Sequence, residues 1–229
     1  MRFPLSITCG LLLLLGLMIG CSGGDDGQEG ETQMEEKAQK AEATEVSLED
    51  KRSDIRSDDN PIVTIETDFG KMVLELYRDV APGHADSFVA RTSDGFYNGL
   101  TFHRIVEHFM IQGGDPSGNG TGNAGYYLDA EFSDLPHQEG TLSMARSRSP
   151  NSASCQFFIC LARNRSTESL DGQYTVFGQL LKGYDVLHKV AGVAVEANPM
   201  NPREISKPVQ PVYMKRLYLS DAEGDEISG

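Results

Sequence analysis

Residues 102–115 read FHRIVEHFMIQGGD, and this stretch decides the fold. Its first half alternates as a strand with one buried face does, which places Phe102, Arg104 and Val106 on the same face. Met110 and Gln112 share a face in the strand that follows. We therefore expect one guanidinium and one carboxamide among apolar side chains on the surface that the two strands share.

Two later runs extend this surface. Residues 142–145 read LSMA, and residues 154–160 read SCQFFIC, where Gln156 and Phe158 share a face if the run is a strand. An apolar surface with a few polar groups is typical of a binding pocket, and this one suits a peptide better than a charged metabolite. Taken alone, Arg104 also fits a snorkelling or ion-paired strand arginine, and QFFIC also fits a buried core strand.

Together with SLDGQYTVFG at residues 169–178, these runs resemble the cyclophilin family of peptidyl-prolyl cis-trans isomerases. The resemblance implies an enzyme that acts on proline-containing polypeptides without a cofactor or a metal. It implies that the catalytic residues are Arg104, Phe109 and Gln112. It also implies that the substrate is bound by Met110, Ala145, Arg146, Gln156, Phe158, Leu170 and Tyr174. Many eukaryotic members carry tryptophan at Ser169 and histidine at Tyr174.

The expected chemistry matches this set of side chains. Rotation about an X-Pro bond makes and breaks no covalent bond, so the enzyme needs no nucleophile, metal or general base. A donor near the prolyl nitrogen stabilises the pyramidal form that this nitrogen adopts in the transition state. We expect Arg104 to be that donor. The alternatives are a non-catalytic peptide-binding module or holdase chaperone, and a cell-envelope scaffold that binds through its acidic linker.

The chain after residue 60 is predicted to form mainly short strands. Residues 62–66 and 72–76 alternate in polarity around a turn at residues 68–70, which predicts a hairpin. Further strands are expected near residues 140–145, 156–161, 174–178 and 212–219. Residues 198–211 hold four prolines and predict an exposed loop.

Two helices are predicted among these strands. Ala85, Phe88, Val89 and Thr92 recur at helical spacing after Pro82, and a second helix is expected near residues 184–191. Many short strands with two helices indicate a mainly β fold. With the cyclophilin resemblance, we expect a closed antiparallel eight-stranded β-barrel capped by two α-helices.

The N-terminal residues have the layout of an export signal. Arg2 precedes an apolar run that ends in LMIGC at residues 17–21. This run is shorter than the roughly 20 residues of a comfortable membrane span. Its ending resembles a bacterial lipobox, which implies a signal peptide at residues 1–20 and a lipid on Cys21. An ordinary cleaved signal and an uncleaved anchor are the alternatives. We expect an envelope protein anchored to a membrane, facing the periplasm if the host is Gram-negative.

Composition divides the remainder of the chain. Residues 21–60 are polar, acidic and almost free of aromatic residues, which predicts a flexible linker. Residues 61–221 are expected to form the isomerase domain, and residues 222–229 a disordered tail. The net charge of −14 at pH 7 argues against binding to nucleic acid.

Other motifs point away from metal and phosphate chemistry. The glycine-rich residues 113–125 lack the lysine and the following helix of a phosphate-binding motif, so a plain loop is expected there. The five histidines show no metal-binding spacing, and no Ser-His-Asp signature stands out. We expect a monomer.

Overall fold

The computed structural model of the chain describes Ser57 and residues 59–227. The predicted signal peptide, the lipidation site at Cys21 and nearly all of the predicted linker lie outside these residues. No helix in the described part of the chain is long and apolar enough to cross a membrane.

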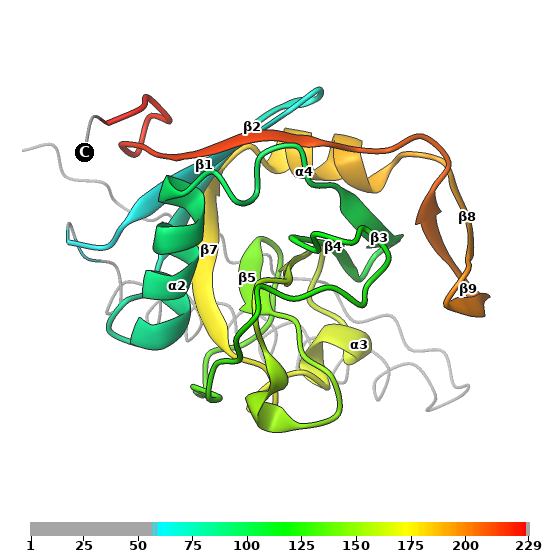
Figure 1. Cartoon of the computed structure of the whole chain (residues 1–229), viewed down its shortest axis with the longest axis horizontal. Helices are drawn as coiled ribbons and strands as arrows, with labels where there is room; N and C mark the ends of the chain where they lie inside the picture. The colour runs from blue at the N-terminus through cyan, green and yellow to red at the C-terminus, as the bar shows by residue number, and fades with distance from the viewer. Residues whose placement is uncertain (1–56, 58, 228–229) are drawn as a thin grey trace, which may run out of the picture. The chain divides into compact units, whose positions relative to one another are not determined.

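The domain begins with the predicted hairpin, formed by β1 (Ile62–Thr67) and β2 (Gly70–Leu76) (Figure 1). Their antiparallel register runs from Ile62 opposite Glu75 to the turn at Gly70. Gly70 has a φ of +129°, a backbone conformation that is available to glycine and strained for other residues. The turn therefore depends on the glycine.

Six further strands extend the hairpin into one curled antiparallel sheet. They are β3 (Phe102–Val106), β4 (Met110–Gly113), β5 (Thr141–Met144), β6 (Phe157–Cys160), β7 (Val176–Lys182) and β10 (Met214–Leu219). The order across the sheet is β10, β1, β2, β7, β5, β6, β4, β3.

The eight antiparallel strands agree with the predicted fold class, whereas a closed barrel is not confirmed. The two end strands, β10 and β3, approach each other where Thr101 pairs with Tyr213 in an isolated bridge. Within the described residues the two strands form no ladder with each other. The architecture is thus a curled sheet that nearly meets itself.

Helix α2 (Pro82–Ser93) forms where helical spacing predicts it. Proline at the first position suits a helix start, because the N–H that it lacks has no partner inside the helix. Glu131 caps this end from a distant loop, since its carboxylate accepts hydrogen bonds from the backbone N–H groups of Gly83 and His84, each at 3.0 Å. The helix buries Phe88 and its neighbours, and it packs against β7 and β10.

The second predicted helix is α4 (Tyr184–Ala191), which buries Val186, Leu187 and Val190. It packs against β2. A third, one-turn helix, α3 (Arg165–Glu168), was not predicted. Its capping residue Asn164 also donates a hydrogen bond to the carbonyl of His108, at 2.6 Å, and so joins α3 to the turn between β3 and β4.

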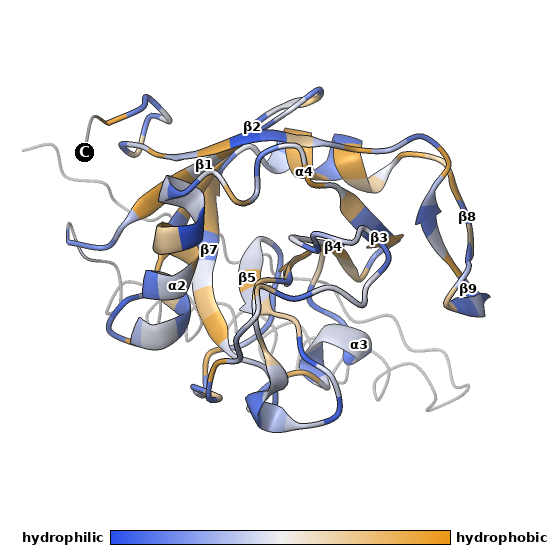
Figure 2. Cartoon of the chain, in the orientation of Figure 1, coloured by the Kyte–Doolittle hydropathy of each residue, from blue (hydrophilic) through white to orange (hydrophobic). Residues whose placement is uncertain are grey.

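Aromatic side chains fill the core between α2 and the sheet. The ring of Phe88 lies 5.0 Å from that of Tyr97, 5.1 Å from that of Phe157 and 5.4 Å from that of Phe177, measured between centroids. Figure 2 shows the matching apolar colour on β1, β7 and α2. Because all four rings are buried, this cluster holds the helix to the sheet.

The prediction of an exposed loop at residues 198–211 is wrong. Most of this segment belongs to a hairpin of β8 (Val195–Asn198) and β9 (Asn201–Pro208), which packs against β3 (Figure 1). A two-stranded hairpin leaves one edge of each strand unpaired, so it tolerates prolines such as Pro202 and Pro208. The four prolines therefore do not exclude strand structure in this segment.

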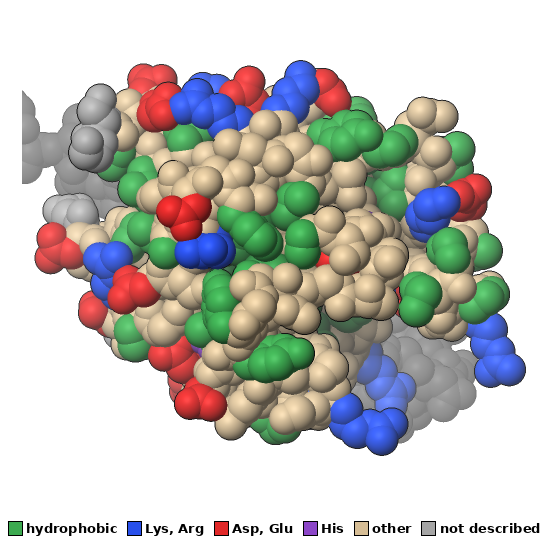
Figure 3. All heavy atoms as spheres, in the orientation of Figure 1, with side chains coloured by type: hydrophobic (Ala, Val, Ile, Leu, Met, Phe, Trp, Pro, Cys, Tyr) green, Lys and Arg blue, Asp and Glu red, His purple; other side chains and the backbone are tan. Residues whose placement is uncertain are grey.

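The surface carries exposed ion pairs. Lys215 lies 2.5 Å from Asp68, and Lys189 lies 2.8 Å from Asp185. Figure 3 shows acidic and basic side chains next to each other along the upper edge of one face. Exposed pairs contribute at most about 1 kcal/mol each, so the core contributes more to the stability of the fold than these pairs do.

Replacing Phe88 by alanine is expected to lower the free energy of unfolding by about 3–5 kcal/mol, because the change leaves a cavity among three aromatic rings. Phe69→Ala is the matched control, since Phe69 is 38 % exposed near the first turn and should lose less than about 1 kcal/mol. Urea unfolding of both variants measures the difference. Equal losses would contradict the assignment of Phe88 to the core.

Candidate active site

A bulge in β3 separates two apolar clusters. The pairing of β3 with β4 shifts register between Phe102 and Arg104. Phe102 consequently joins Ile105 in the main core, while Arg104 and Val106 face the opposite side. The prediction that Phe102 shares a face with Arg104 is therefore wrong, because a bulge interrupts the strict alternation of a strand.

The opposite side of β3, β4 and β6 carries a second, smaller apolar cluster. Its buried members are Met110, Phe158 and Cys160, with Cys160 completely buried. Partly buried side chains pack around them: Val106, Phe109, Ala145, Leu170 and Tyr174. Met110 stands opposite Cys160, and Gln112 opposite Phe158, in the β4–β6 ladder. The strands thus hold a carboxamide next to an apolar floor.

A pocket of about 200 Å³ opens over this cluster. It is referred to below as the apolar pocket, and its lining residues are Arg104, Phe109, Met110, Gln112, Ala145, Arg146, Phe158, Leu170 and Tyr174. Nine of the ten residues that the sequence predicted for the site therefore lie around one cavity.

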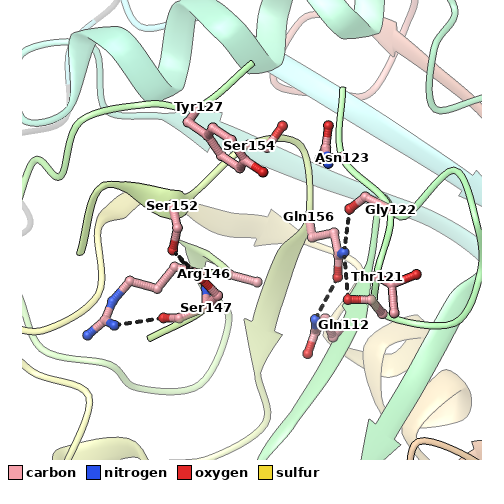
Figure 4. A pocket seen from close by; sticks show the side chains of 12 residues that line it. Gln112, Thr121, Gly122, Asn123, Tyr127, Arg146, Ser147, Ser152, Ser154 and Gln156 are labelled. Carbon is pink, nitrogen blue, oxygen red and sulfur yellow. Dashed lines mark hydrogen bonds between the residues drawn. The ribbon is translucent and has the colours of Figure 1, made fainter. Parts of the chain in front are cut away.

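The tenth residue, Gln156, lies in a second pocket of about 200 Å³, referred to below as the polar pocket (Figure 4). The two pockets share Gln112, Ala145 and Arg146 as lining residues, so they adjoin. Further lining comes from residues 120–123, Tyr127, Ser147, Ser152 and Ser154. Together the two pockets form a continuous surface whose shape suits an extended chain with one apolar and several polar groups.

Hydrogen bonds fix the two glutamines at the boundary between the pockets. Gln112 donates from Nε2 to Oε1 of Gln156 at 3.0 Å. Gln156 donates in turn to the backbone carbonyls of Gly120 and Gly122, at 3.1 and 2.8 Å (Figure 4). The glycine-rich segment is a loop, as predicted, and it forms one wall of the polar pocket. Asp115 orders this loop by accepting backbone hydrogen bonds from residues such as Ser117, at 2.8 Å.

The guanidinium of Arg104 is held on two sides. Nη1 donates to Oε1 of Gln112 at 3.2 Å, within the apolar pocket. Nε and Nη2 each donate to one carboxylate oxygen of Glu204, both at 2.7 Å. Arg104 is therefore ion-paired, which was one interpretation of this residue from the sequence. It also lines the pocket, which was the other.

The sequence did not predict Glu204 as the partner of Arg104, nor the residues of the polar pocket other than Gln112, Ala145, Arg146 and Gln156. Glu204 lies on β9, within the segment that was predicted to be a loop. Arg104 lowers the pKa of the Glu204 carboxyl from 4.5 to about 2, against the opposing effect of burial. The REISKP run of β9 offers no sequence signal for this role, because its apolar residue Ile205 is exposed while the polar Glu204 and Ser206 are partly or wholly buried.

Arg146 forms the rim between the pockets. Its guanidinium lies 4.5 Å from the ring centroid of Tyr174, at stacking distance. Nε and Nη2 donate to the backbone carbonyl of Gln173 at 3.0 and 2.9 Å. The side chain is therefore attached to the loop that carries Tyr174 rather than extended into solvent.

A buried histidine supports the floor of the apolar pocket. The ring of His137 stacks on that of Phe158, with 5.9 Å between centroids and 14° between planes. Its Nδ1 lies 3.0 Å from Asp171 and its Nε2 lies 2.9 Å from Ser143. These three residues resemble a Ser-His-Asp triad in their contacts, which the sequence did not reveal. His137 and Ser143 are wholly buried, so the arrangement supports Phe158 and does not reach a substrate.

Comparison with known proteins agrees with this geometry. Residues 62–217 match the family model described as cyclophilin type peptidyl-prolyl cis-trans isomerase/CLD. The chain belongs to the cyclophilin family. A cyclophilin is a peptidyl-prolyl cis-trans isomerase, so the chain falls in that enzyme class and its substrates are proline-containing polypeptides.

Curated cyclophilin relatives match over most of their own length. The peptidyl-prolyl cis-trans isomerase ppi1 of Schizosaccharomyces pombe is 38 % identical over 64 % of this chain and 97 % of its own. That of Acinetobacter baylyi is 37 % identical over 72 % of this chain and 89 % of its own. A solved cyclophilin of Cryptosporidium parvum, in the presence of the dipeptide Ala-Pro, has a TM-score of 0.63 and 31 % identity, covering 70 % of this chain and 99 % of that one.

We expect the pair of Arg104 and Glu204 to stabilise this cyclophilin only where Glu204 is ionised. Because the folded-state pKa is lowered from 4.5 to about 2, the contribution is complete above about pH 4.5 and is lost as the pH falls through about 2. Glu204→Gln should lower the free energy of unfolding at pH 7 by on the order of 2 kcal/mol. Urea unfolding between pH 7 and pH 2 should show this deficit shrinking toward zero.

The matched control is Glu196→Gln on the same hairpin. Glu196 pairs with Lys207 at 2.8 Å, and both side chains are about half exposed. Its replacement should cost less than about 1 kcal/mol at any pH. A deficit of Glu204→Gln that did not change with pH would mean that the carboxylate charge is not its cause.

Proposed function

We propose that Arg104 assists rotation about X-Pro bonds by donating a hydrogen bond to the prolyl nitrogen. The rotation barrier of roughly 18–20 kcal/mol arises from amide resonance, which a pyramidal nitrogen cannot maintain. A cationic donor binds the lone pair of that nitrogen in the transition state more strongly than the planar amide of the ground state. The observation that supports this role is the place of the Arg104 guanidinium in the pocket wall, where Nη1 contacts Gln112 at 3.2 Å. The other arginine of the lining, Arg146, is bound instead to the backbone carbonyl of Gln173.

In this proposal the apolar pocket holds the proline ring. Phe109, Met110, Phe158 and Leu170 offer the ring apolar surfaces, and Phe158 is kept rigid by the stacked ring of His137. A fixed proline lets the carbonyl group that precedes it turn while the rest of the substrate stays bound. Proximity of a fixed donor to a fixed ring supplies the orientation that the rotation needs.

The polar pocket holds the peptide next to the proline. Gln112 and Gln156 stand at its boundary, already oriented by hydrogen bonds to each other and to the glycine-rich loop. Ala145 and Arg146 line both pockets, so the backbone there is in reach of a chain that crosses from one pocket to the other. Proline-containing segments of exported proteins are the substrates that we infer.

Arg104→Ala is expected to slow isomerisation of a short X-Pro peptide about a hundredfold, which corresponds to a loss of about 2.7 kcal/mol in transition-state stabilisation. NMR exchange spectroscopy on the domain from residue 61 onward measures the rate directly. Arg78→Ala is the control, because Arg78 forms an exposed pair with Asp86 outside the site and should leave the rate unchanged. Full activity of Arg104→Ala would refute the role of this guanidinium.

A folded parent that binds the peptide without accelerating its exchange would instead support the peptide-binding module. In that outcome the pockets recognise proline but do not favour the transition state over the ground state, which is uniform binding. Chemical-shift changes of the peptide without exchange broadening would identify this case.

We also propose that the chain is exported and anchored to a membrane through a lipid on Cys21. The support is the apolar run ending in LMIGC at residues 17–21. Full-length chain produced in a bacterium with radiolabelled palmitate should incorporate label and sediment with membranes, whereas Cys21→Ser should do neither. Membrane sedimentation of both proteins without label would favour an uncleaved anchor, and a soluble, unlabelled parent would favour an ordinary cleaved signal.

A further inference from the structure

The hairpin of β8 and β9 reaches the arginine of the apolar pocket. Glu204 on β9 binds Arg104 on β3 across 100 positions of sequence, through two parallel hydrogen bonds of 2.7 Å. The Arg104 and Glu204 side chains are only 28 % and 24 % exposed. A bidentate, half-buried pair of this kind is among the stronger and more directional ion pairs in proteins.

We propose that Glu204 is a positioning residue for prolyl isomerisation, which it serves by fixing the guanidinium of Arg104 in the orientation needed to donate to the substrate. This inference rests on the proposed role of Arg104. Glu204 does not line either pocket, so it acts on the reaction through the arginine.

The planar shape of the guanidinium lets Glu204 control where Nη1 points. The group is planar, so two hydrogen bonds along its Nε–Nη2 edge fix the whole plane. The position of Nη1 is thereby fixed as well. Nη1 is the nitrogen that contacts Gln112, at 3.2 Å, inside the apolar pocket. Glu204 therefore occupies the edge that faces the hairpin, while Nη1, which also lies 3.8 Å from the sulfur of Met110, is on the side that faces the pocket.

Glu204 is itself held by the hairpin. Ser206 Oγ donates to Oε1 of Glu204 at 2.6 Å, and Asn198 Nδ2 donates to Ser206 Oγ at 3.2 Å. Ser206 is completely buried, whereas Ile205 between the two is 57 % exposed, so this face of β9 is turned toward β3. The carboxylate thus has a fixed position from which it can orient a long side chain.

A carboxylate has two opposing effects on a catalytic cation. It holds the donor still, so that less side-chain entropy remains to be lost when the arginine binds its substrate. It also offsets part of the positive charge that attracts the prolyl lone pair. We infer that positioning outweighs the loss of charge, because a preorganised donor acts in the transition state without reorganisation. If the loss of positive charge outweighed the positioning, Glu204 would slow the reaction.

The kinetic test compares Glu204→Ala and Glu204→Asp with the control Glu196→Ala on the same hairpin. Glu196 bears the same charge and pairs with Lys207 away from the pockets. Glu204→Ala should lower kcat for a short X-Pro peptide about tenfold with less than a twofold change in KM. Glu204→Asp keeps the charge on a shorter side chain and should recover part of kcat, and Glu196→Ala should match the parent.

A double-mutant cycle shows whether Glu204 acts through Arg104. Once Arg104 is alanine, the further change Glu204→Ala should leave the residual rate unchanged within about twofold. Independent losses that multiply in the double variant would overturn the proposal, since they would assign Glu204 a role apart from the arginine. Circular dichroism and urea unfolding of each variant separate a kinetic loss from a loss of fold.

A spectroscopic readout separates this inference from the proposed function. The Nε–H of Arg104, hydrogen-bonded to a carboxylate, should give a resolved, slowly exchanging resonance that Glu204→Ala abolishes and Glu196→Ala preserves. If that resonance is present and Glu204→Ala is as fast as the parent or faster, the positioning role is overturned while the enzyme stands. If the folded parent does not isomerise the peptide at all, the resonance shows the pair intact and the failure lies with the proposed function.

Discussion

The register shift in β3 is the constraint on which the site depends. A strictly alternating strand would place Phe102 and Arg104 on one face, and the guanidinium would then compete with the aromatic core for the same space. The bulge lets Phe102 enter the main core while Arg104 and Val106 face the second cluster. One short strand thereby contributes side chains to both apolar clusters. The hydrogen-bonded ladder from β3 through β4 to β6 connects the pocket to the packed core.

The two sides of the pocket are rigid for different reasons. On one side, His137 supports Phe158 from beneath, and Asp171 accepts hydrogen bonds from both the ring and the backbone N–H of His137. Burial alone would raise the pKa of Asp171, but these bonds and the nearby Arg163 guanidinium outweigh it and keep the pKa below its usual value. On the other side, Arg104 and its partners connect β9 to the glycine-rich loop. Packing fixes the apolar floor, and hydrogen bonds fix the polar wall.

Much of the fold followed from local pattern. The hairpin of β1 and β2, helix α2 and helix α4 each have a periodicity that the sequence displays directly, and all three are present as predicted. The lining of the apolar pocket followed from motifs that the family resemblance recognises, whereas most of the lining of the polar pocket did not. The predictions that failed concern contacts between residues that are far apart in the sequence. The bulge at Phe102 depends on the competition between two clusters, and the closure of the sheet depends on how its end strands meet.

The partner of Arg104 was missed for the same reason. Glu204 lies 100 residues away in a segment whose prolines favoured a loop, and no local property of either residue names the other. At the level of sequence, an ion pair and a place in the pocket were alternative interpretations of Arg104. In the structure they hold together, because a guanidinium has two edges and each serves a different neighbour.

The domain contains two cysteine thiols, Cys160 in β6 and Cys155 in the loop before it, and neither makes the fold sensitive to the redox state of its surroundings. Both Cys155 and Cys160 are free and buried, and burial raises their pKa values to about 11 and about 12. At pH 7 both thiols are therefore almost entirely protonated, and the thiolate is the form that reacts with oxidants and alkylating agents. The folded domain can thus enter an oxidising or a reducing compartment without a change in its covalent connectivity. Both sulfurs become reactive only when the chain opens, which makes them natural reporters of unfolding.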